Sequence, residues 1–531
     1  MDKFIIDKAN ELEVKDNFDS INKDVDYSKY VKVKTPFYKR SLFPRLIGGL
    51  STLVCILVIV LIVTLGSLDV NLGNGNKPES NDPEAPEQIE PGVESAPTQD
   101  NSKPDEILPS FNYENNKPYL LFEAKEKANT SKFREYTNVE LPAFLNKINN
   151  FASKLTVELY NDSSKNKNDN YCISPVSIYM GLAMAIECSN GNTRDEILNT
   201  VGVTYKEVEM FTEYIFSVMN KEDYSDDNET LYYCQKLANS IWINENLKLK
   251  KNGLERLASL YNCSSYYTPF TTNNENASKA VNDYIKEMTN GLITPEINYD
   301  SSTMFLLINT YYLKSNWSNA SKELKYTEEK YSFTEYDNDI KEINLLQGYY
   351  NEGLVYETDK YRQFYTTTTN GIVLKFIVPK NGYSINDIFT YETLQEVNST
   401  NYKVFNHEEK LWYFTRCFFP EFTAKYQGNI AKSLMDMGIR DLFRKTDFTN
   451  ITDDSAYCSE VYHEAILNVD KVGIEGAAAT SVKAGAAGEP DYEKVYFDFV
   501  VDRDFIFIVS NGTGTRNKIM LFSGVVKEIL L

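Results

Sequence analysis

Histidine is scarce in this chain of 531 residues, which contains only His407 and His463. A Ser-His-Asp hydrolase needs one of them as its general base. His463 lies in the strand-like apolar stretch EVYHEAIL, which is typical of a buried core residue, and His407 lies in NHEEK, which lacks the HExxH spacing of zinc proteases. Gly512 and Gly514 lack the third glycine of a dinucleotide-binding loop. The sequence therefore predicts a protein that is not an enzyme and that holds neither a metal nor a cofactor.

Paired cysteines and an excess of basic residues are also absent. The seven cysteines are scattered without a CxxC pair, which argues against the common zinc and redox motifs. The sequence leaves open whether six of them form disulfides or stay free thiols; the seventh, Cys55, falls in an apolar run. The chain has 55 Lys and Arg against 76 Asp and Glu, a net charge of -21. This acidity argues against nucleic acid as a partner, because phosphate binding needs basic patches.

One long apolar run, Leu46–Leu68, holds 23 residues without a charge. That length can cross a bilayer as a helix. A core helix would alternate polar and apolar faces, and a signal peptide would begin nearer the N-terminus and be shorter. Basic residues precede the run and acidic residues follow it. The positive-inside rule then places the N-terminus in the cytoplasm and everything after Leu68 outside the cell, as a single-pass protein of the plasma membrane.

Composition divides the chain into four regions. Residues 1–45 form a polar tail in the cytoplasm, and residues 46–68 form the transmembrane helix. Residues 69–137 form a disordered extracellular linker, in which Asp69–Ser110 holds seven prolines, ten acidic residues and two basic ones. This composition is typical of an extended, self-repelling chain. Globular patterning begins at Asn138, so residues 138–531 are expected to form the folded domain.

Within that domain, helical and strand-like patterns alternate without regular βαβ units. Leu141–Tyr160 has apolar residues at helical spacing. Ser174 is expected to cap a helix that runs to Cys188, with Pro175 in its first turn. Strand-like runs are found at residues 240–244, 303–313, 371–378, 461–469, 497–510 and 518–526. Helices first and strands mostly later favour a mixed α+β fold.

Gly473–Gly488, GIEGAAATSVKAGAAG, is a long run of small residues near the C-terminus. With period two its only charges, Glu475 and Lys483, fall on one face, which is the pattern of a strand with one buried side. Ala and Gly are nevertheless poor strand formers. The run is therefore a candidate for conditional insertion into a sheet.

This run resembles the reactive-loop hinge of serpins, protease inhibitors that trap their target by loop insertion. Other segments resemble the family in the expected order, over about Asn138–Leu531. They are NYCISPVSIYMGLAMA from Asn170, GNTRDEIL from Gly191, LANSIW from Leu237, TNGLI from Thr289, LLINTYYLKSNW from Leu306, MGIRDLF from Met437, SEVYHEAILNVD from Ser459, DRDF from Asp502 and LFSGVV from Leu521. Each block alone is weak, but their ordered succession is specific.

The resemblance implies the serpin fold of three β-sheets and eight to nine helices with an exposed reactive-centre loop. It also implies a one-use trap, in which the protease forms an acyl-enzyme with the loop and the hinge then inserts into the central sheet. The residues that match the hinge are Gly473, Ile474, Glu475, Gly476, Ala477, Ala478, Ala479 and Thr480. Ile474 stands where the family usually has Thr or Ser, and its bulk is expected to slow the first step of insertion.

The family's spacing from the hinge glycine implies a reactive bond between Ala487 and Gly488. The neighbouring residues are all small, which suits the shallow pockets of elastase-like or subtilisin-like proteases. Lys483, the nearest basic residue, lies too early to serve a trypsin-like target.

The resemblance also assigns a polar cluster under the central sheet, called the shutter, to Ser174, Ser177, Asn309 and His463. Buried polar groups of this kind need hydrogen-bond partners, since losing one costs about 1–3 kcal/mol. Trp317 matches the residue at the end of the sheet, the breach, where the loop first enters. Its other interpretation is an ordinary buried aromatic residue.

Taken together, the sequence predicts a monomeric, membrane-anchored serpin that inhibits a serine protease outside the cell. The alternative is a non-inhibitory serpin that serves as a binding or adhesion module at the cell surface. The abundance of Asn, Lys, Tyr and Ile is typical of an AT-rich genome and favours a bacterial source.

Overall fold

The structure, a computed structural model, describes residues 106–108, 118–124, 140–162, 169–219, 221–224, 231–317, 323–368, 370–444, 446–458, 461–475, 492–512 and 518–529. Within these ranges, no helix has the length and apolar character needed to cross a membrane. The predicted span at residues 46–68 lies outside them, so it stays a prediction.

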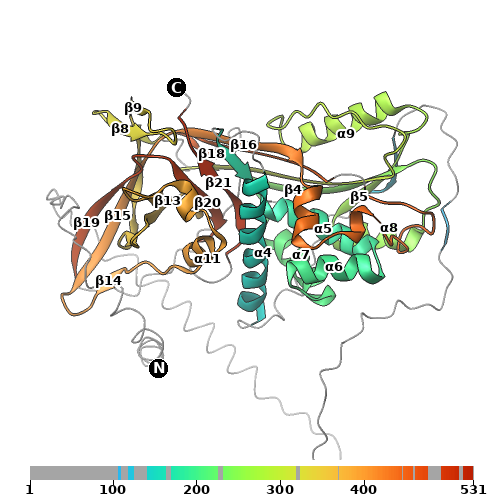
Figure 1. Cartoon of the computed structure of the whole chain (residues 1–531), viewed down its shortest axis with the longest axis horizontal. Helices are drawn as coiled ribbons and strands as arrows, with labels where there is room; N and C mark the ends of the chain where they lie inside the picture. The colour runs from blue at the N-terminus through green and yellow to red at the C-terminus, as the bar shows by residue number, and fades with distance from the viewer. Residues whose placement is uncertain are drawn as a thin grey trace, which may run out of the picture. The chain divides into compact units, whose positions relative to one another are not determined.

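A central sheet dominates the described part of the chain (Figure 1). Its order is β1 (Tyr119–Phe122), β5 (Cys263–Thr268), β4 (Leu231–Asn244), β6 (Phe305–Asn316), β18 (Gly473–Glu475), β17 (Tyr462–Val469) and β16 (Phe422–Asn429), and β3 (Lys221–Tyr224) pairs with β4. The two longest strands, β4 and β6, run antiparallel from Tyr233↔Ser315 to Ile243↔Phe305. The short strand β18 joins the two halves of the sheet.

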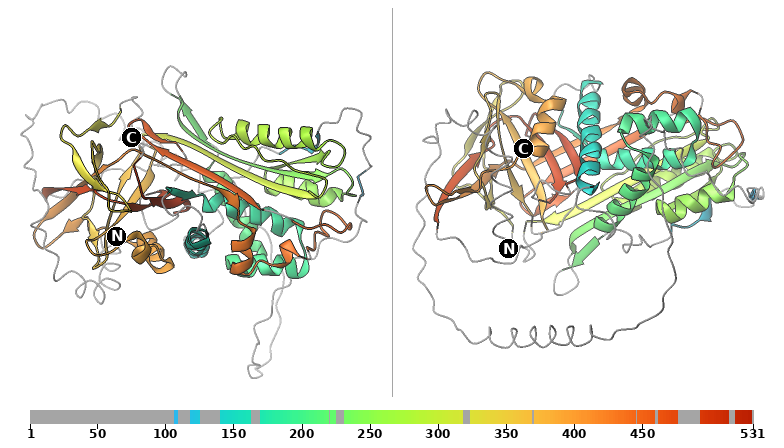
Figure 2. Two further views of the ribbon diagram at one scale, coloured as in Figure 1. Left: turned by 45° about the horizontal axis from the view of Figure 1, so that its top comes forward. Right: turned by 90° about the horizontal axis from the view of Figure 1, so that it is seen from below.

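Helices cover both faces of this sheet (Figure 2). On one face lies α9 (Asn274–Met288), whose Val281 and Ile285 share an apolar cluster with Leu306 and Ile308 of β6. The opposite face, to which Tyr311 and Leu313 belong, joins the main core. Strand periodicity explains this division, because successive side chains point to opposite faces. The helices on the core side include α5 (Pro175–Cys188), α6 (Gly191–Val201), α7 (Tyr205–Val218) and α8 (Lys251–Leu260).

Two further large sheets and one small one complete the described β-structure. The six-stranded sheet has the order β11 (Tyr356–Glu357), β12 (Tyr361–Thr367), β13 (Ile372–Pro379), β20 (Phe505–Asn511), β21 (Met520–Val526) and β2 (Tyr171–Ile173). The five-stranded sheet has the order β14 (Phe405–Asn406), β15 (Leu411–Phe419), β10 (Leu346–Glu352) and β7 (Lys325–Tyr326), with β19 (Glu493–Val500) parallel to β15. The two-stranded sheet is β8 (Tyr331–Thr334) with β9 (Ile340–Ile343).

The other helices are α4 (Glu140–Asp162), α10 (Ile385–Ile388), α11 (Tyr391–Ser399), α12 (Ala431–Met437) and a 3₁₀ turn at Asp441–Phe443. The described residues thus contain nine α-helices and several sheets, which confirms the expected α+β architecture. One prediction was wrong: the strand-like run at residues 497–510 is two strands in two different sheets, β19 and β20, because the chain leaves one sheet at Val501 and enters the next at Phe505.

Helix α5 begins where the sequence predicts, with Pro175 in its first turn. Ser174 occupies the N-cap position with extended backbone, but its side chain makes no capping hydrogen bond. The expected cap is therefore absent, and Ser174 lines a cavity described below. Thirteen of the fourteen helical residues are buried, so packing holds this helix in place without the cap.

Part of the stretch predicted as linker pairs with the folded domain. Strand β1 adds antiparallel to β5 at the edge of the central sheet, with Tyr119 opposite Tyr267 and Phe122 opposite Ser265. Ile107 forms an isolated bridge to Lys250. The domain therefore contains segments before position 138, because backbone pairing recruits four residues that are too few to be recognised as a strand in the sequence.

Candidate functional site

A tight turn at residues 470–472 leads from β17 into β18. The Asp470 carboxylate accepts hydrogen bonds from the backbone N–H groups of Val472 (2.7 Å) and Gly473 (2.9 Å), an Asx-type arrangement that closes the turn. Trp317, which follows the last residue of β6 and is 1% exposed, donates from Nε1 to the Asp470 carbonyl oxygen at 2.7 Å. Its indole thus supports the turn from which β18 starts.

Strand β18 is the first part of the predicted hinge, and it lies inside the central sheet. Gly473 pairs with Asn316 on one side, and Glu475 pairs with Lys314 and Asn468. A Cβ atom at Gly473 would lie 2.4 Å from the carbonyl oxygen of Ser315, so this close approach requires glycine. The Glu475 carboxylate accepts a hydrogen bond from the Tyr312 hydroxyl at 2.7 Å.

Ile474 is already buried in this arrangement, at 1% exposed. The sequence predicted that its bulk slows the first step of insertion. In this structure that step has taken place, since Ile474 pairs with Ser315 and Val469 between the two strands. Its apolar side chain stabilises the partly inserted hinge, because burying a side chain of this size contributes about 1.5–3 kcal/mol.

Beyond Glu475 a gap separates β6 from β17, which we call the slot. Its walls are β6 residues 305–313 and β17 residues 462–467. In the described part of the chain no strand pairs with both walls along this length, and β18 is the link between them. Within the described residues the two walls are therefore not joined to each other by ladder hydrogen bonds along this length.

The polar cluster predicted under the sheet is assembled beside the slot. His463 accepts at Nε2 a hydrogen bond from the backbone N–H of Ser174 (3.2 Å), and the Ser177 hydroxyl donates to the Asn309 carbonyl oxygen (3.4 Å). The Asn309 amide donates to the Asn239 side-chain oxygen at 2.7 Å. The Ser174 hydroxyl and the Asn309 side-chain oxygen are buried and find no hydrogen-bond partner among the described residues. The cluster is therefore only partly satisfied.

Burial keeps His463 neutral, because desolvation lowers its pKa to about 3. Its Nε2 faces a backbone N–H, not a hydroxyl, so it does not activate a serine as a general base would. Two cavities, of about 60 and about 200 Å³, are lined by His463, Asn309 and Ser177 among other residues. The cluster thus borders free space below the slot.

The remaining predicted site residues lie outside the described ranges. They are Gly476, Ala477, Ala478, Ala479 and Thr480 of the hinge and the reactive pair Ala487 and Gly488. The chain leaves the described part at Glu475 and returns at Tyr492, just before β19.

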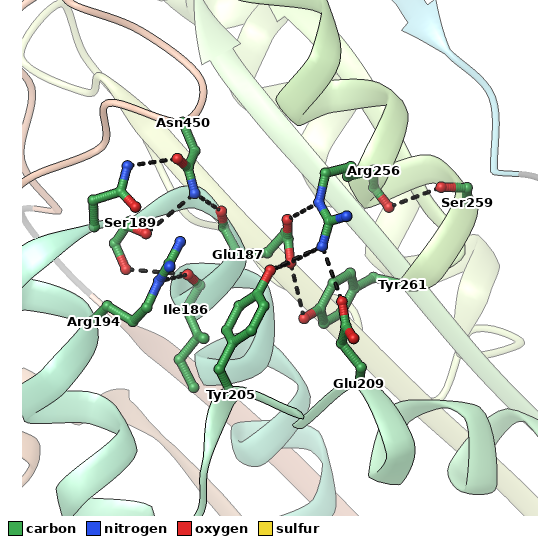
Figure 3. A network of polar contacts seen from close by, with 11 residues as sticks. Ile186, Glu187, Ser189, Arg194, Tyr205, Glu209, Arg256, Ser259, Tyr261 and Asn450 are labelled. Atoms are coloured by element: carbon green, nitrogen blue, oxygen red, sulfur yellow. Dashed lines mark hydrogen bonds and ion pairs between the residues drawn. The ribbon is translucent and has the colours of Figure 1, made fainter. Parts of the chain in front are cut away.

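A second buried polar cluster, which the sequence did not reveal, lies at the other end of α5 (Figure 3). The Glu187 carboxylate is 2% exposed and faces the Arg256 guanidinium of α8, whose Nε lies 2.5 Å and Nη2 3.3 Å from its oxygens. The Tyr205 hydroxyl donates to Glu187 at 2.7 Å and the Tyr261 hydroxyl at 3.4 Å. Arg256 also reaches Glu209 of α7 at 3.0 Å. We call these five residues the Glu187 cluster.

Backbone contacts extend this cluster to the end of the helix. Asn450 donates to the carbonyl oxygens of Glu187 (2.8 Å) and Ser189 (3.2 Å), and Arg194 donates to that of Ile186 (3.2 Å). Two of the carbonyl groups that the C-terminus of α5 leaves open, those of Ile186 and Glu187, thereby gain side-chain donors. The signal for this site in the sequence was a lone charge, Glu187, in the apolar run IYMGLAMAIEC.

The six cysteines of the described residues are free and buried: Cys172, Cys188, Cys234, Cys263, Cys417 and Cys458. The sequence had left disulfides and thiols as alternatives, and the structure favours thiols. Burial raises their pKa values above the ordinary range wherever a shift is resolved, as for Cys172 and Cys188. They are therefore packing residues in this arrangement.

A wide central sheet whose two halves are linked by a three-residue strand, with a partly bonded polar cluster beside the slot, defines a class of mixed α+β proteins with an open position in the sheet. The sequence profile described as "Serpin (serine protease inhibitor)" matches residues 146–529. The chain therefore belongs to the serpin family, whose members are typically protease inhibitors, although some are non-inhibitory.

Known relatives agree with this assignment. Serpin A3-1 of Bos taurus is 29% identical over 336 residues, which cover 60% of this chain and 75% of that protein. Thyroxine-binding globulin of Rattus norvegicus is 25% identical over 416 residues, which cover 74% of this chain and 92% of that protein. The crystal structure of the thermophilic serpin Tengpin in the native state is similar with a TM-score of 0.58 at 23% identity, covering 78% of this chain and 100% of that one. The structural likeness supports the fold alone.

Proposed function

We propose that this chain is a cell-surface inhibitor of serine proteases that acts as a suicide substrate. The observation that supports this most is the position of β18, which pairs with β6 and β17 at the head of the open slot. A loop whose first three residues already lie between two strands can continue into the sheet without changing register.

Continuing that register gives each hinge residue its neighbours in the inserted state. Five residues beyond Glu475, Thr480 falls opposite Asn309 of β6 and His463 of β17. Alternation puts its side chain on the same face as the buried Ile474, toward the polar cluster. We expect the Thr480 hydroxyl to supply the partner that the Asn309 oxygen and the Ser174 hydroxyl lack.

The chemistry of the proposed trap belongs to the protease. Its serine Oγ attacks the carbonyl carbon of Ala487, the bond to Gly488 breaks, and the amine of Gly488 leaves with a proton from the protease histidine. The hinge is then free to insert as an additional strand, and each ladder hydrogen bond contributes about 0.5–1.5 kcal/mol net. Insertion moves the tethered acyl-enzyme before water can hydrolyse the ester.

We propose an elastase-like or subtilisin-like target, because the residues before the bond, Ala484 to Ala487, are all small. We also propose that residues 46–68 anchor the protein in the plasma membrane with the domain outside the cell. The charge asymmetry across this run supports that orientation.

The test mixes the chain from Asp69 onward with an elastase-type protease and separates the products on a denaturing gel. We expect a covalent band at the summed mass, and its mass spectrum should locate the bond at Ala487–Gly488. Ala478→Glu should abolish this band while the loop is still cut, because the continued register points residue 478 into the core beside Tyr311 and Ala465. Ala477→Glu is the matched control, since it puts the same charge on the opposite face of the strand, the face on which Glu475 already meets Tyr312, and should still trap.

The alternative is a non-inhibitory serpin used as a surface binding module, as the likeness to thyroxine-binding globulin illustrates. Two results together would favour this alternative. The loop would be cut while the protease stays active, and neither wild type nor Ala477→Glu would form a covalent band with any protease that cleaves after small residues. A gain in thermal stability after the cut would then say whether the loop inserts at all.

A further inference from the structure

The larger of the two cavities, of about 200 Å³, lies between helix α5 and the strands β6 and β17. Three small residues of α5, Ser177, Gly181 and Ala185, make room for it, because residues four apart share one face of a helix. A Cβ atom added at Gly181 would meet no other atom within 4 Å. The free space therefore begins directly at the backbone of the helix.

The lining of this cavity is mostly apolar. It includes Leu182, Leu307, Ile430, Leu442 and Val461. Apolar walls around a few polar groups are typical of sites that bind small molecules. An apolar cavity of about 150 Å³ engineered in another protein binds benzene. The cavity beside α5 therefore has room for a compact ring system somewhat larger than benzene.

One hydrogen-bond acceptor in this cavity is left open. Among the described residues, several buried side-chain atoms find no hydrogen-bond partner, and of these the side-chain oxygen of Asn309 is the one that lines this cavity. The Asn309 amide already donates to Asn239 at 2.7 Å, and the neighbouring Ser177 and His463 have partners as well. A buried acceptor without a partner costs free energy. A ligand with one donor would remove that cost.

The cavity reaches solvent at the loop between α9 and β6. Asn298, Asp300 and Ser302 of this loop belong to its lining and are exposed. Hydrogen bonds from Ser302 lower the pKa of Asp300, so a negative charge lies at this entrance. The charge repels an anionic ligand and leaves the entrance open to an uncharged one.

We propose that this cavity binds a compact, uncharged apolar molecule whose single hydrogen-bond donor bonds the Asn309 oxygen. The register of β18, continued, brings Thr480 and Val482 of the loop opposite Asn309 and Leu307, on the face of β6 that borders the cavity. The bound molecule and the inserting loop therefore exclude each other. This competition rests on the proposed function, whereas binding to the intact protein does not.

The binding experiment uses the full chain in detergent micelles and two probes of nearly the same shape, a fluorinated indole and the matching benzofuran. The indole carries one N–H donor, and the benzofuran has an oxygen in its place. Fluorine NMR follows the binding of each probe. Gly181→Leu fills the cavity, Gly181→Ala fills part of it, and Asn309→Leu removes the acceptor. Uptake of probe by the micelles is common to all variants and cancels in the comparison.

We expect wild type to bind the indole roughly three- to tenfold more tightly than the benzofuran, because only the indole reaches the open acceptor with a donor. Gly181→Ala should weaken the binding of both probes, Gly181→Leu should abolish it, and Asn309→Leu should bind both probes equally. Equal affinity of wild type for the two probes would overturn the proposal, and this comparison decides even if Gly181→Leu does not fold. Undiminished binding to a folded Gly181→Leu would also overturn it.

A second experiment tests the competition with an elastase-type protease, added with and without a saturating amount of the indole. The readout is the fraction of cleaved chain that holds protease covalently. We expect the indole to lower this fraction severalfold in wild type and to leave it unchanged in Gly181→Leu, which also controls for any effect on the protease. An unchanged fraction in wild type would overturn the competition. If the chain is cut without the indole and forms no covalent complex, the proposed inhibitory function fails, and the binding experiment still decides on the cavity.

Discussion

Helix α5 carries a buried polar cluster at each end, and the two differ in how completely they are bonded. At its C-terminal end, the Glu187 carboxylate accepts from Arg256, Tyr205 and Tyr261. At its N-terminal end, the Ser174 hydroxyl and the Asn309 side-chain oxygen have no partner among the described residues. One helix thus joins a completed network to one that lacks a member.

This difference in hydrogen bonding shows which part of the fold resists rearrangement and which part can change. A buried charge with all its partners resists rearrangement, because removing one partner strands the other in a low-dielectric interior. A buried hydroxyl without a partner raises the free energy of the state that contains it. The first arrangement holds α5, α7 and α8 together, and the second is consistent with the proposed insertion, which would bring the missing partner.

The largest expected effect comes from breaking the completed end. Arg256→Ala leaves the Glu187 charge buried and unpaired, which should lower the free energy of unfolding by about 3–5 kcal/mol. Urea unfolding followed by tryptophan fluorescence measures the loss. The double variant Glu187→Leu with Arg256→Met should recover most of it, since an apolar pair of similar size needs no compensation. If Arg256→Ala alone is as stable as wild type, the ion pair does not stabilise the C-terminal end of α5.

A pH titration sharpens the comparison at the incomplete end. The native state keeps His463 neutral with a pKa of about 3, against an ordinary value of 6.5. Below pH 6.5 the His463 imidazole binds a proton in the unfolded chain but not in the native state. The free energy of unfolding therefore falls as the pH falls toward 3. By pH 5 this amounts to about 2 kcal/mol.

The measurement compares wild type with His463→Gln at pH 7 and pH 5. The wild type should lose about 2 kcal/mol more than the variant over this interval. Asp504, whose pKa burial raises to about 6, titrates in the same range with the opposite sign, and the difference between the two proteins removes its contribution. Equal losses in both would mean that the imidazole is not the source.

Two conservative variants test whether the polar clusters at the two ends of α5 change the free energy of unfolding in opposite directions. Tyr205→Phe removes a donor to a buried carboxylate and should cost about 1.5–3 kcal/mol. Ser174→Ala removes a hydroxyl that has no hydrogen-bond partner among the described residues and should be neutral or stabilise the native state by up to about 1 kcal/mol. Denaturant midpoints measured side by side are sufficient. If both variants destabilise the protein to the same degree, the two clusters do not differ in how completely they are hydrogen-bonded.

The smallest effect concerns the member that the incomplete cluster lacks. Thr480→Val keeps the shape of the side chain but removes the hydroxyl that we expect to meet Asn309 and His463 after insertion. The intact protein should keep its stability, and the loop-cleaved protein should lose about 1 kcal/mol of its gain. Calorimetry of both forms measures this, with Ser481→Ala, on the opposite face, as the control. A loss in the intact protein instead would contradict the continued register.

Local sequence patterns predicted the elements of this fold well where periodicity and packing agree. Pro175 marks the start of α5, and β13 and β17 lie within a residue or two of the runs predicted at 371–378 and 461–469. The resemblance brought Ser174, Ser177, Asn309 and His463 into one cluster, and in the structure all four line one cavity. Blocks of sequence thus carry both the fold and this part of the site.

Partnerships between distant elements were not predictable from the sequence. Glu187 was visible as a lone charge in an apolar run, but its partner Arg256 is 69 positions away on another helix. The depth of hinge insertion was also hidden, because it depends on the turn that Asp470 and Trp317 close. The pattern of Gly473–Gly488 indicated which side chains face inward and not how many residues are already inside.

The slot between β6 and β17 has a consequence for the order of the reaction that fills it. Its walls recognise backbone, and backbone is the same in every copy of this protein. Insertion of the chain's own loop is first order and does not depend on concentration, whereas insertion of a neighbour's loop is second order. Confining molecules to a surface raises the concentration that each slot experiences. The proposed membrane anchor, by confining molecules to a plane, would therefore set an upper limit on the density at which the protein still acts one molecule at a time.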